Sequence, residues 1–478
     1  MATPALGPLQ RHVALVGFMG AGKSTLAAEV SLRVGRPFLD LDDEIEQRSG
    51  STIAELFRAS ESGFRSAEEE IVCEVLERRE PHVLALGGGA ILSERTRRTL
   101  RERAITVLVP VDVGTAWRRV EGSGRPLAQG REPFEQLYRQ REPLYVDVAD
   151  ATASDADDVA LAAAGVHVER GALRQLGQLI LGDGATDLVS DPHVAGIHGM
   201  DAQLALGSRL AQTHELPLGE EAKTLGAIDR LWHDLRLDRS GTIVALGGGC
   251  TTDAAGFAAA TYLRGIDWVP VPTSLVAQVD AAIGGKTAID LPQGKNLVGA
   301  FHWPARTVID PALLETLPPE QRREGMAEVV KTALLAGEPL HELADDELVR
   351  RCAAFKAAVC LRDPHDHADR KMLNLGHTFA HALEAAAGYE GVTHGQAVAL
   401  GLLAALRLSG RDIGQVVELL HPQPVKVDRD KAWVAMQRDK KTVGGQLRLV
   451  LLEEAGPAWD VPVPPEDVRR ALDELIAG

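Results

Sequence analysis

The stretch Val13–Val30, VALVGFMGAGKSTLAAEV, decides the fold. Its apolar start predicts a buried strand, its glycines predict a tight loop, and its Ala-rich end predicts a helix. The loop Gly17–Ser24 has the spacing GxxxxGK[ST], and it lies between strand and helix, where a phosphate-binding loop must lie. Backbone N–H groups of such a loop surround phosphates, Lys23 would reach the outer phosphates, and Ser24 would ligate Mg²⁺. A glycine-rich turn with an accidental Lys-Ser pair is the weaker alternative.

A second strand–glycine–helix pattern starts at Thr242 and reads TIVALGGGCTTDAAGFAAA. Its glycines predict a pyrophosphate-binding turn at a helix N-terminus, although three glycines can also form a purely structural turn. Between the two patterns, one helical period ends at Gly165 and a new strand begins at Val166. We therefore expect two α/β domains, residues 1–165 and 166–478. The second domain would divide into a nucleotide-binding half, residues 166–333, and an all-helical half, residues 334–478.

Composition excludes several classes of function. The chain has 478 residues, 45% of them hydrophobic, and 51 Lys and Arg against 68 Asp and Glu give a net charge of −17. That charge disfavours nonspecific binding to nucleic acid or an anionic membrane, so anionic substrates would need local basic pockets. No apolar run is long enough to span a membrane, and no signal peptide is recognisable. Four scattered cysteines fit a reducing compartment, so we expect a cytoplasmic protein.

Carboxylates and arginines follow the first glycine loop. Asp40 and Asp42 alternate at the end of a short predicted strand, so they lie on one side of it; one could organise Mg²⁺ and the other a substrate hydroxyl. The alternative is a capping cluster for the next helix. Arg65 and Arg141 would suit a carboxylate, because a planar guanidinium binds that group in a bidentate manner. A substrate without a carboxylate, as in another small-molecule P-loop kinase, would not require both.

From about Val13 to Ala164, these elements resemble shikimate kinase. The resemblance implies a P-loop fold of the nucleoside monophosphate kinase type, with a parallel sheet, that transfers phosphate from ATP with Mg²⁺ to shikimate. It assigns Asp40, with Ser24, to Mg²⁺, and Asp42, with Lys23, to catalysis. Arg125 would be the catalytic lid arginine, which approaches the phosphates as charge builds up on them. The other contacts that it implies are ATP at Gly20, Ala21, Gly22, Lys23, Ser24, Thr25, Arg119 and Arg125, and shikimate at Asp42, Arg65, Gly87, Gly88, Gly89 and Arg141.

The stretch Lys371–Gly395, KMLNLGHTFAHALEAAAGYEGVTHG, carries three histidines. His377 and His381 are four residues apart in a run with helical spacing, so both point from one helical face, and His394 follows in a loop. Two helical histidines, a third from a loop and a carboxylate could bind zinc. Taken alone, an HxxxH spacing more often marks partly buried histidines without a metal.

The second domain, about residue 166 to the end, resembles 3-dehydroquinate synthase. The resemblance implies NAD⁺, Zn²⁺ (with Co²⁺ as an alternative) and 3-deoxy-D-arabino-heptulosonate 7-phosphate as substrate. It assigns the metal to Glu328, His377 and His394, and it gives His381 a catalytic contact with substrate. The NAD⁺ contacts that it implies are Asp191, Glu220, Lys223, Gly248, Gly249, Asp253, Thr273, Ser274, Lys286 and Lys295. The substrate contacts that it implies are Arg264, Asp280, Lys286, Lys295, Asn296, Lys331, Lys356, Arg370, Asn374 and Lys441, of which Arg264, Asp280, Lys286 and Lys331 would take part in catalysis.

The chemistry of such a site can be reasoned from its parts. A zinc-bound hydroxyl oxidised by NAD⁺ becomes a ketone, which acidifies the neighbouring C–H and allows phosphate to leave; reduction, ring opening and an aldol step would follow. The alternatives are a polyol dehydrogenase, which would need far fewer basic residues, and a cyclase for another sugar phosphate. One domain could also have become a binding module. The resemblance further implies small-molecule substrates, aromatic amino acid biosynthesis and a homodimer formed through the second domain.

Overall fold

The structure is a computed structural model that describes residues 6–123, 126–128, 130–389, 391–439, 447–454 and 456–477. The chain divides into two compact units, Met1–Gly165 and Val166–Gly478. We describe each unit separately.

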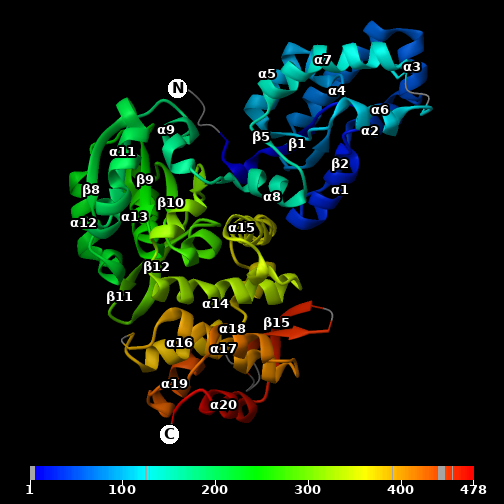
Figure 1. Ribbon diagram of the computed structural model, residues 1–478. Coiled ribbons are helices and arrows are strands. Elements are labelled where there is room, and N and C mark those ends of the chain that lie inside the picture. The colour runs from blue at the N-terminus through cyan, green and yellow to red at the C-terminus, as the bar shows by residue number, and fades with distance from the viewer. Residues whose placement is uncertain are drawn as a thin grey trace. The chain divides into compact units, whose positions relative to one another are not determined.

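Unit 1 is built on a parallel five-stranded sheet with the order β2-β3-β1-β4-β5. Helices α1 and α8 pack together, as do α4 and α5, and the helices cover the two faces of the sheet (Figure 1). The strands are β1 (His12–Val16), β2 (Phe38–Asp40), β3 (Val83–Ala85), β4 (Ala104–Leu108) and β5 (Ala151–Thr152). The helices are α1 (Lys23–Val34), α2 (Leu41–Ser49), α3 (Ile53–Ala59), α4 (Glu61–Leu76), α5 (Glu94–Arg103), α6 (Val113–Val120), α7 (Arg131–Val148) and α8 (Ala156–Ala164).

Strand β1 lies at the centre of this sheet, and all five of its residues are buried. Val13 pairs with Val83 of β3 on one side and with Ile105 of β4 on the other. Because the strands are parallel, the segments that follow β1, β2 and β3 meet at one edge of the sheet. The glycine loop follows β1, Asp40 is the last residue of β2, and the second glycine run, Gly87–Gly89, follows β3.

The first part of unit 2 contains a second parallel sheet, with the order β10-β9-β7-β8. The strands are β7 (Thr186–Ser190), β8 (Leu210–Glu215), β9 (Thr242–Gly247) and β10 (Asp267–Pro272); β13 (Thr307–Ile309) pairs with β6 (Val166–Val168), and β11 (Lys286–Leu291) forms a hairpin with β12 (Gly294–Phe301). The helices are α9 (Leu176–Leu179), α10 (Pro192–Val194), α11 (Met200–Leu206), α12 (Leu225–Asp234) and α13 (Gly249–Thr261).

The second part of unit 2 is mainly helical. Its helices are α14 (Pro319–Ala336), α15 (Asp345–Arg362), α16 (His377–Ala386), α17 (His394–Leu408), α18 (Gly414–Leu420), α19 (Arg429–Asp439) and α20 (Pro465–Asp473). The expected boundary at residue 333 falls inside α14, so this part begins at Pro319, where a proline starts the helix. The expected all-helical half also contains an antiparallel hairpin, β14 (Leu447–Glu453) with β15 (Gly456–Val463). Alternate leucines of β14 are buried, which is the period of a strand.

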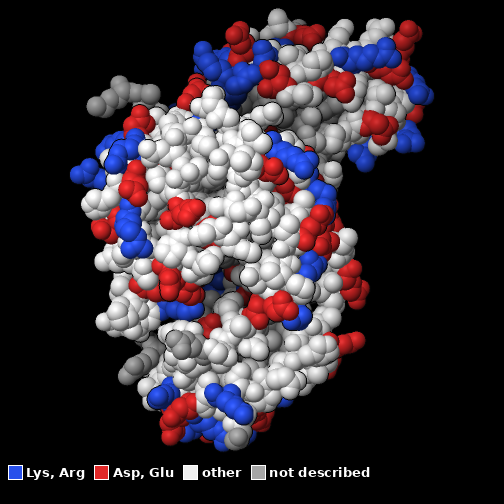
Figure 2. Space-filling view, turned by 60° about the vertical axis from the view of Figure 1, so that its left-hand side comes forward, with Lys and Arg blue, Asp and Glu red and all other residues white. Residues whose placement is uncertain are grey.

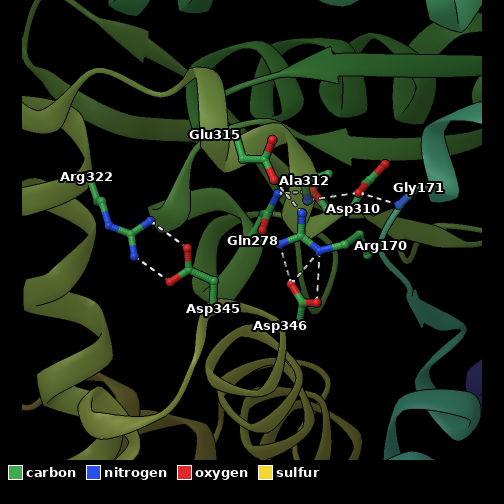
Figure 3. Close-up of polar contacts among 9 residues, drawn as sticks. All are labelled: Arg170, Gly171, Gln278, Asp310, Ala312, Glu315, Arg322, Asp345 and Asp346. Carbon is green, nitrogen blue, oxygen red and sulfur yellow. Dashed lines mark hydrogen bonds and ion pairs between the residues drawn. The ribbon is translucent and has the colours of Figure 1, made fainter.

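Polar contacts fix the start of unit 2 onto its helical part (Figure 3). The Arg170 guanidinium donates to both oxygens of Asp346, at the start of α15, and to Glu315. Asp310 accepts from the backbone N–H groups of Gly171 and Leu173. These contacts hold the segment after β6 near the helix that carries Lys356, although exposed ion pairs such as that of Arg170 add little stability.

On the face of unit 2 that Figure 2 shows, acidic and basic side chains lie next to one another along the edges and in the lower half, and much of the upper middle is white. An extended basic surface, which nucleic acid would require, is not visible on that face. Among the described residues, no helix is long and apolar enough to cross a membrane. The fold class predicted from the sequence is confirmed: the chain is α/β, with parallel sheets and a mainly helical C-terminal part.

Candidate active sites

The loop between β1 and α1 has a shape that requires glycine. Gly20 has a φ of +81°, and a Cβ there would lie 2.9 Å from the carbonyl oxygen of Ala116. The Lys23 ammonium donates to the carbonyl oxygens of Gly17 (2.9 Å) and Phe18 (3.2 Å), so it lies over the loop. The first N–H groups of α1, at Lys23, Ser24 and Thr25, point out of the helix, as in sites that bind phosphate.

Asp40 lies next to Ser24, whose hydroxyl donates to Asp40 Oδ2 at 2.5 Å. Asp40 also caps α2, because its other carboxylate oxygen accepts from the N–H of Asp42 at 3.0 Å. The capping role and a role in Mg²⁺ binding are therefore compatible. Arg119 donates to the carbonyl oxygen of Gly20 at 2.9 Å, which puts it beside the loop, whereas Arg125 lies outside the described residues.

A cavity of about 300 Å³ opens beside this loop and is lined by the predicted substrate residues. Arg141 donates to the carbonyl oxygen of Gly88 at 3.0 Å, and the hydroxyl of Tyr145 donates to the same oxygen at 2.6 Å. Burial raises the pKa of Tyr145 to about 12, so its hydroxyl remains a donor. The expected shikimate contacts in its wall are Asp42, Arg65, Gly87, Gly88, Gly89 and Arg141.

Glu68 is a residue of this cavity that the sequence reasoning missed. Its side chain is buried on α4, and one oxygen accepts from Arg65 Nη1 at 2.6 Å. Burial raises the pKa of Glu68, and the charge of Arg65 opposes that shift. A Cβ at Gly87 would lie 2.9 Å from Glu68 and 2.6 Å from Asp42, so Gly87 admits both carboxylates. The spacing of three residues between Arg65 and Glu68 was a usable signal, since it places both on one helical face.

The second glycine turn lies where it was predicted, between β9 and α13. A Cβ at Gly248 would lie 3.5 Å from the Ser274 hydroxyl, so the segments after β9 and β10 are close. The N–H of Thr273 donates to the carbonyl oxygen of Gly247 at 3.0 Å. Asp191, which follows β7, caps α10 and accepts from Thr251 at 3.3 Å. These groups lie at the carboxyl ends of parallel strands, where nucleotides bind in such sheets.

Five of the predicted residues form two ion pairs and one further hydrogen bond near this turn. The Lys223 ammonium donates to Asp253 at 2.8 Å and to Asn296. The Lys295 ammonium donates to Glu220 at 2.5 Å and lies over the ring of Tyr389. Asn296 has a φ of +56° and its N–H donates to Asp290.

Glu328, His377 and His394 converge, although they come from three helices. Glu328 Oε1 lies 3.3 Å from His377 Nε2 and 3.2 Å from His394 Nε2, and the three donor atoms lie within 4.8 Å of one another. A carboxylate oxygen and two imidazole nitrogens form a donor set that suits Zn²⁺ or Co²⁺. His381 lies one turn beyond His377, with ring centroids 5.7 Å apart, and is outside this group.

Three charged groups lie beside this candidate donor set. The Lys331 ammonium lies 2.5 Å from Glu328 Oε2 and 3.5 Å from Asp280, and the Lys356 ammonium lies 2.6 Å from Asp280. Burial opposes the charge of Lys331, but Asp280 and Glu328 outweigh it and raise its pKa. For Lys356, burial dominates and lowers the pKa.

A cavity of about 530 Å³ in unit 2 brings together residues of the cofactor and substrate sets. Lys286 in its wall donates to Asp366 at 2.6 Å, and Arg370 donates to the carbonyl oxygen of Gly284 at 2.9 Å. Arg264 is exposed and is not in this wall, nor is Asn374. Lys441 lies outside the described residues. The predicted residues in the wall are Asp253, Asp280, Lys286, Asn296, Lys356 and Arg370.

Fold and sites together define a chain that joins a P-loop kinase unit to an α/β unit with a glycine turn and three residues that could hold a metal ion. Family models match accordingly: shikimate kinase over residues 19–169, and the N-terminal and C-terminal parts of 3-dehydroquinate synthase over residues 213–324 and 325–442. The bifunctional shikimate kinase/3-dehydroquinate synthase of Thermotoga maritima is 33% identical over 97% of this chain and 100% of its own length. The chain therefore belongs to the family of bifunctional shikimate kinase/3-dehydroquinate synthases, enzymes of the shikimate pathway.

Other similar proteins match the second unit. The 3-dehydroquinate synthase of Gloeobacter violaceus is 41% identical over 65% of this chain and 96% of its own length. A crystal structure of 2-deoxy-scyllo-inosose synthase, in complex with carbaglucose-6-phosphate, NAD⁺ and Co²⁺, matches 65% of this chain and 96% of its own, with 28% identity and a TM-score of 0.58.

Proposed function

We propose that unit 1 binds ATP with Mg²⁺ at the loop before α1 and shikimate in the adjoining cavity. Lys23 would hold the outer phosphates, and Ser24 and Asp40 would hold Mg²⁺, which neutralises charge on the phosphates when bound. Arg65 and Arg141 would bind the carboxylate of shikimate. Asp42 would accept the hydrogen of the attacking hydroxyl and so direct its oxygen at the terminal phosphate. The adjacency of the glycine loop to a cavity with two arginines carries this proposal.

We propose that unit 2 converts 3-deoxy-D-arabino-heptulosonate 7-phosphate to 3-dehydroquinate. Glu328, His377 and His394 would hold Zn²⁺ or Co²⁺, and the turn at Gly248 would hold NAD⁺. When bound, the metal would polarise a substrate hydroxyl and NAD⁺ would accept its hydride. Lys356 and Arg370 would bind the anionic ends of the substrate, and Lys286 and Lys331 would stabilise the departing phosphate.

One continuous set of contacts carries the second proposal. Lys356 contacts Asp280, Asp280 contacts Lys331, and Lys331 contacts the metal donor Glu328. In the set itself, Asp280 and Glu328 balance the charges of Lys356 and Lys331, and it joins the proposed metal donor to the cavity wall. In that wall the buried Arg370 guanidinium donates to the carbonyl oxygens of Gly284 and Pro364, and a buried guanidinium held by neutral carbonyl groups favours a bound anion, which a neutral polyol does not offer. These contacts therefore favour an anionic phosphate substrate that lies against the metal.

The test uses the purified full chain with each cofactor withheld in turn. Phosphate release from the heptulosonate phosphate should require NAD⁺ and a divalent metal, with 3-dehydroquinate as product, whereas phosphorylation of shikimate should require ATP and Mg²⁺ but not NAD⁺. Absence of phosphate release from metal-loaded, NAD⁺-supplied protein would defeat the proposal for unit 2. Equal release from another sugar phosphate would reassign its substrate.

We further propose that the chain acts in the cytoplasm as a homodimer formed through unit 2. The described cysteines are all free thiols, which is consistent with a reducing compartment. Sedimentation equilibrium of the intact chain and of residues 166–478 should give twice the monomer mass in both cases. A monomer for residues 166–478 would place the dimer contacts elsewhere or exclude the dimer.

A further inference from the structure

The orientation of the His394 imidazole depends on contacts with other residues. It is the first residue of α17, and its side chain is 41% exposed, so packing alone does not fix the imidazole. His377, by contrast, is 12% exposed, and its Nδ1 lies 3.2 Å from the carbonyl oxygen of Leu375.

The backbone beside His394 is held by α14. Glu324 accepts from the Thr393 hydroxyl at 2.7 Å and from the N–H of Gly395 at 2.6 Å. A Cβ at Gly395 would lie 2.6 Å from the Glu324 backbone, so the glycine allows this approach. Glu324 is one turn before Glu328, so a single helix holds the start of α17 and supplies a metal donor.

The ring of His394 is held by Glu384 of α16. Glu384 Oε1 lies 3.1 Å from His394 Nδ1, and the Glu384 side chain is only 8% exposed. Glu384 is seven residues after His377, so both lie on one face of α16. A carboxylate that accepts from Nδ1–H fixes the tautomer and leaves Nε2 as the electron-pair donor. That Nε2 is the atom that faces Glu328 and His377.

We propose that Glu384 is a positioning residue of the metal site, which sets metal affinity by fixing the tautomer and orientation of His394. This inference depends on the metal site proposed above. It assigns the two histidines different supports: a neutral carbonyl oxygen for His377 and a buried carboxylate for His394. Loss of the carboxylate should therefore weaken binding through His394 and leave the other two donors in place.

The test is Co²⁺ binding to the metal-free full chain, measured by competition with a chelator and by the visible d–d absorption of the bound ion. Glu384→Ala should weaken Co²⁺ binding about 10- to 100-fold and alter the absorption band, as loss of such a partner typically does. Glu384→Gln, which keeps an acceptor oxygen without the charge, should weaken binding less. Glu418→Ala, on the exposed face of α18, should bind as the unaltered chain does.

Additional measurements distinguish a misfolded variant from a variant that folds but does not bind metal as expected. Thermal unfolding of unit 2 in the metal-free protein reports whether each variant has folded, and shikimate phosphorylation by unit 1 reports whether the rest of the chain is intact. If Glu384→Ala does not fold, the comparison rests on Glu384→Gln. Unchanged affinity and an unchanged absorption band in a folded variant would overturn the role of Glu384. Absence of Co²⁺ binding by the unaltered chain would overturn the metal site, and this inference with it.

Discussion

Gly89→Ala should remove a substrate contact without breaking the fold. Gly89 has φ −107° and ψ −12°, which alanine adopts readily, so the change introduces no backbone strain. The new Cβ would lie 2.5 Å from Arg65 Cζ, which is closer than real contacts allow. The Arg65 side chain is flexible and 22% exposed, so its guanidinium should move while the surrounding residues stay in place.

The size of the effect follows from what Arg65 is proposed to bind. A hydrogen bond to a charged group contributes about 1.5–3 kcal/mol. Its loss should lower kcat/KM for shikimate about 10- to 100-fold, since each 1.4 kcal/mol is a factor of about ten. Steady-state kinetics should show most of the change in KM for shikimate. Gly7→Ala is the matched control, because a Cβ at Gly7 meets nothing within 4 Å.

A double variant tests whether Gly89→Ala and Arg65→Ala remove the same substrate contact. Arg65→Ala should cause a loss similar to that of Gly89→Ala, and the double variant should be no worse than Arg65→Ala alone, because both changes remove one contact. An unaltered KM for shikimate in Gly89→Ala, or losses that add in the double variant, would show that Arg65 does not hold the substrate.

Three further predictions concern stability and the metal. Asp280→Asn leaves Lys331 and Lys356 without the carboxylate that they share. Breaking a buried pair lowers the free energy of unfolding by about 3–5 kcal/mol, and the partial exposure of Asp280 should reduce this loss to about 2 kcal/mol. Calorimetry of the C-terminal unit measures the loss. Burial raises the pKa of Glu68, so the stability that the protonated side chain contributes is present at acidic pH and is lost as the pH rises through that pKa. The thermal midpoint of Glu68→Gln should therefore rise relative to that of the unaltered chain between pH 4 and pH 7. A difference between the two midpoints that does not change with pH would contradict this. A zinc-selective chelator should abolish phosphate release while shikimate phosphorylation in excess Mg²⁺ continues. It should also lower the thermal midpoint of the C-terminal unit, because removing a metal that had been at 1,000 times its Kd lowers the free energy of unfolding by up to about 4 kcal/mol.

Local patterns made the architecture of both units predictable. The strand–glycine–helix patterns at Val13 and Thr242 each predict a strand, a turn and a helix from one continuous stretch of sequence. The break at Gly165 was visible because a helical period ends there. The hairpin β14–β15 was missed because residues 334–478 were predicted to be helical as a whole, although alternate leucines of β14 follow the period of a strand.

The residues that hold the proposed site residues in place were harder to predict, because their own positions depend on tertiary contacts. Glu68 and Glu384 are ordinary helical glutamates in the sequence. Glu68 lies on the same helix as Arg65, but only the tertiary fold brings it into the wall of the cavity, and only the packing of α16 against α17 brings Glu384 to His394. The donor Glu328 is 49 residues before His377, a separation at which spacing carries no geometric information; resemblance alone suggested it. Arg264 illustrates the converse: the resemblance assigned it to the substrate, but it does not line the cavity that contains the other predicted residues, so its role stays a prediction.

The most direct test of two independent sites uses two variants of the full chain, with both reactions measured on each. Lys23→Ala should lose phosphorylation of shikimate and keep full phosphate release from the heptulosonate phosphate; His377→Ala should do the reverse. Each lost activity should fall at least 100-fold, whereas the other should stay within about twofold, as expected when an essential group is removed from one site alone. Loss of both activities in either folded variant would contradict the assignment of one reaction to each unit.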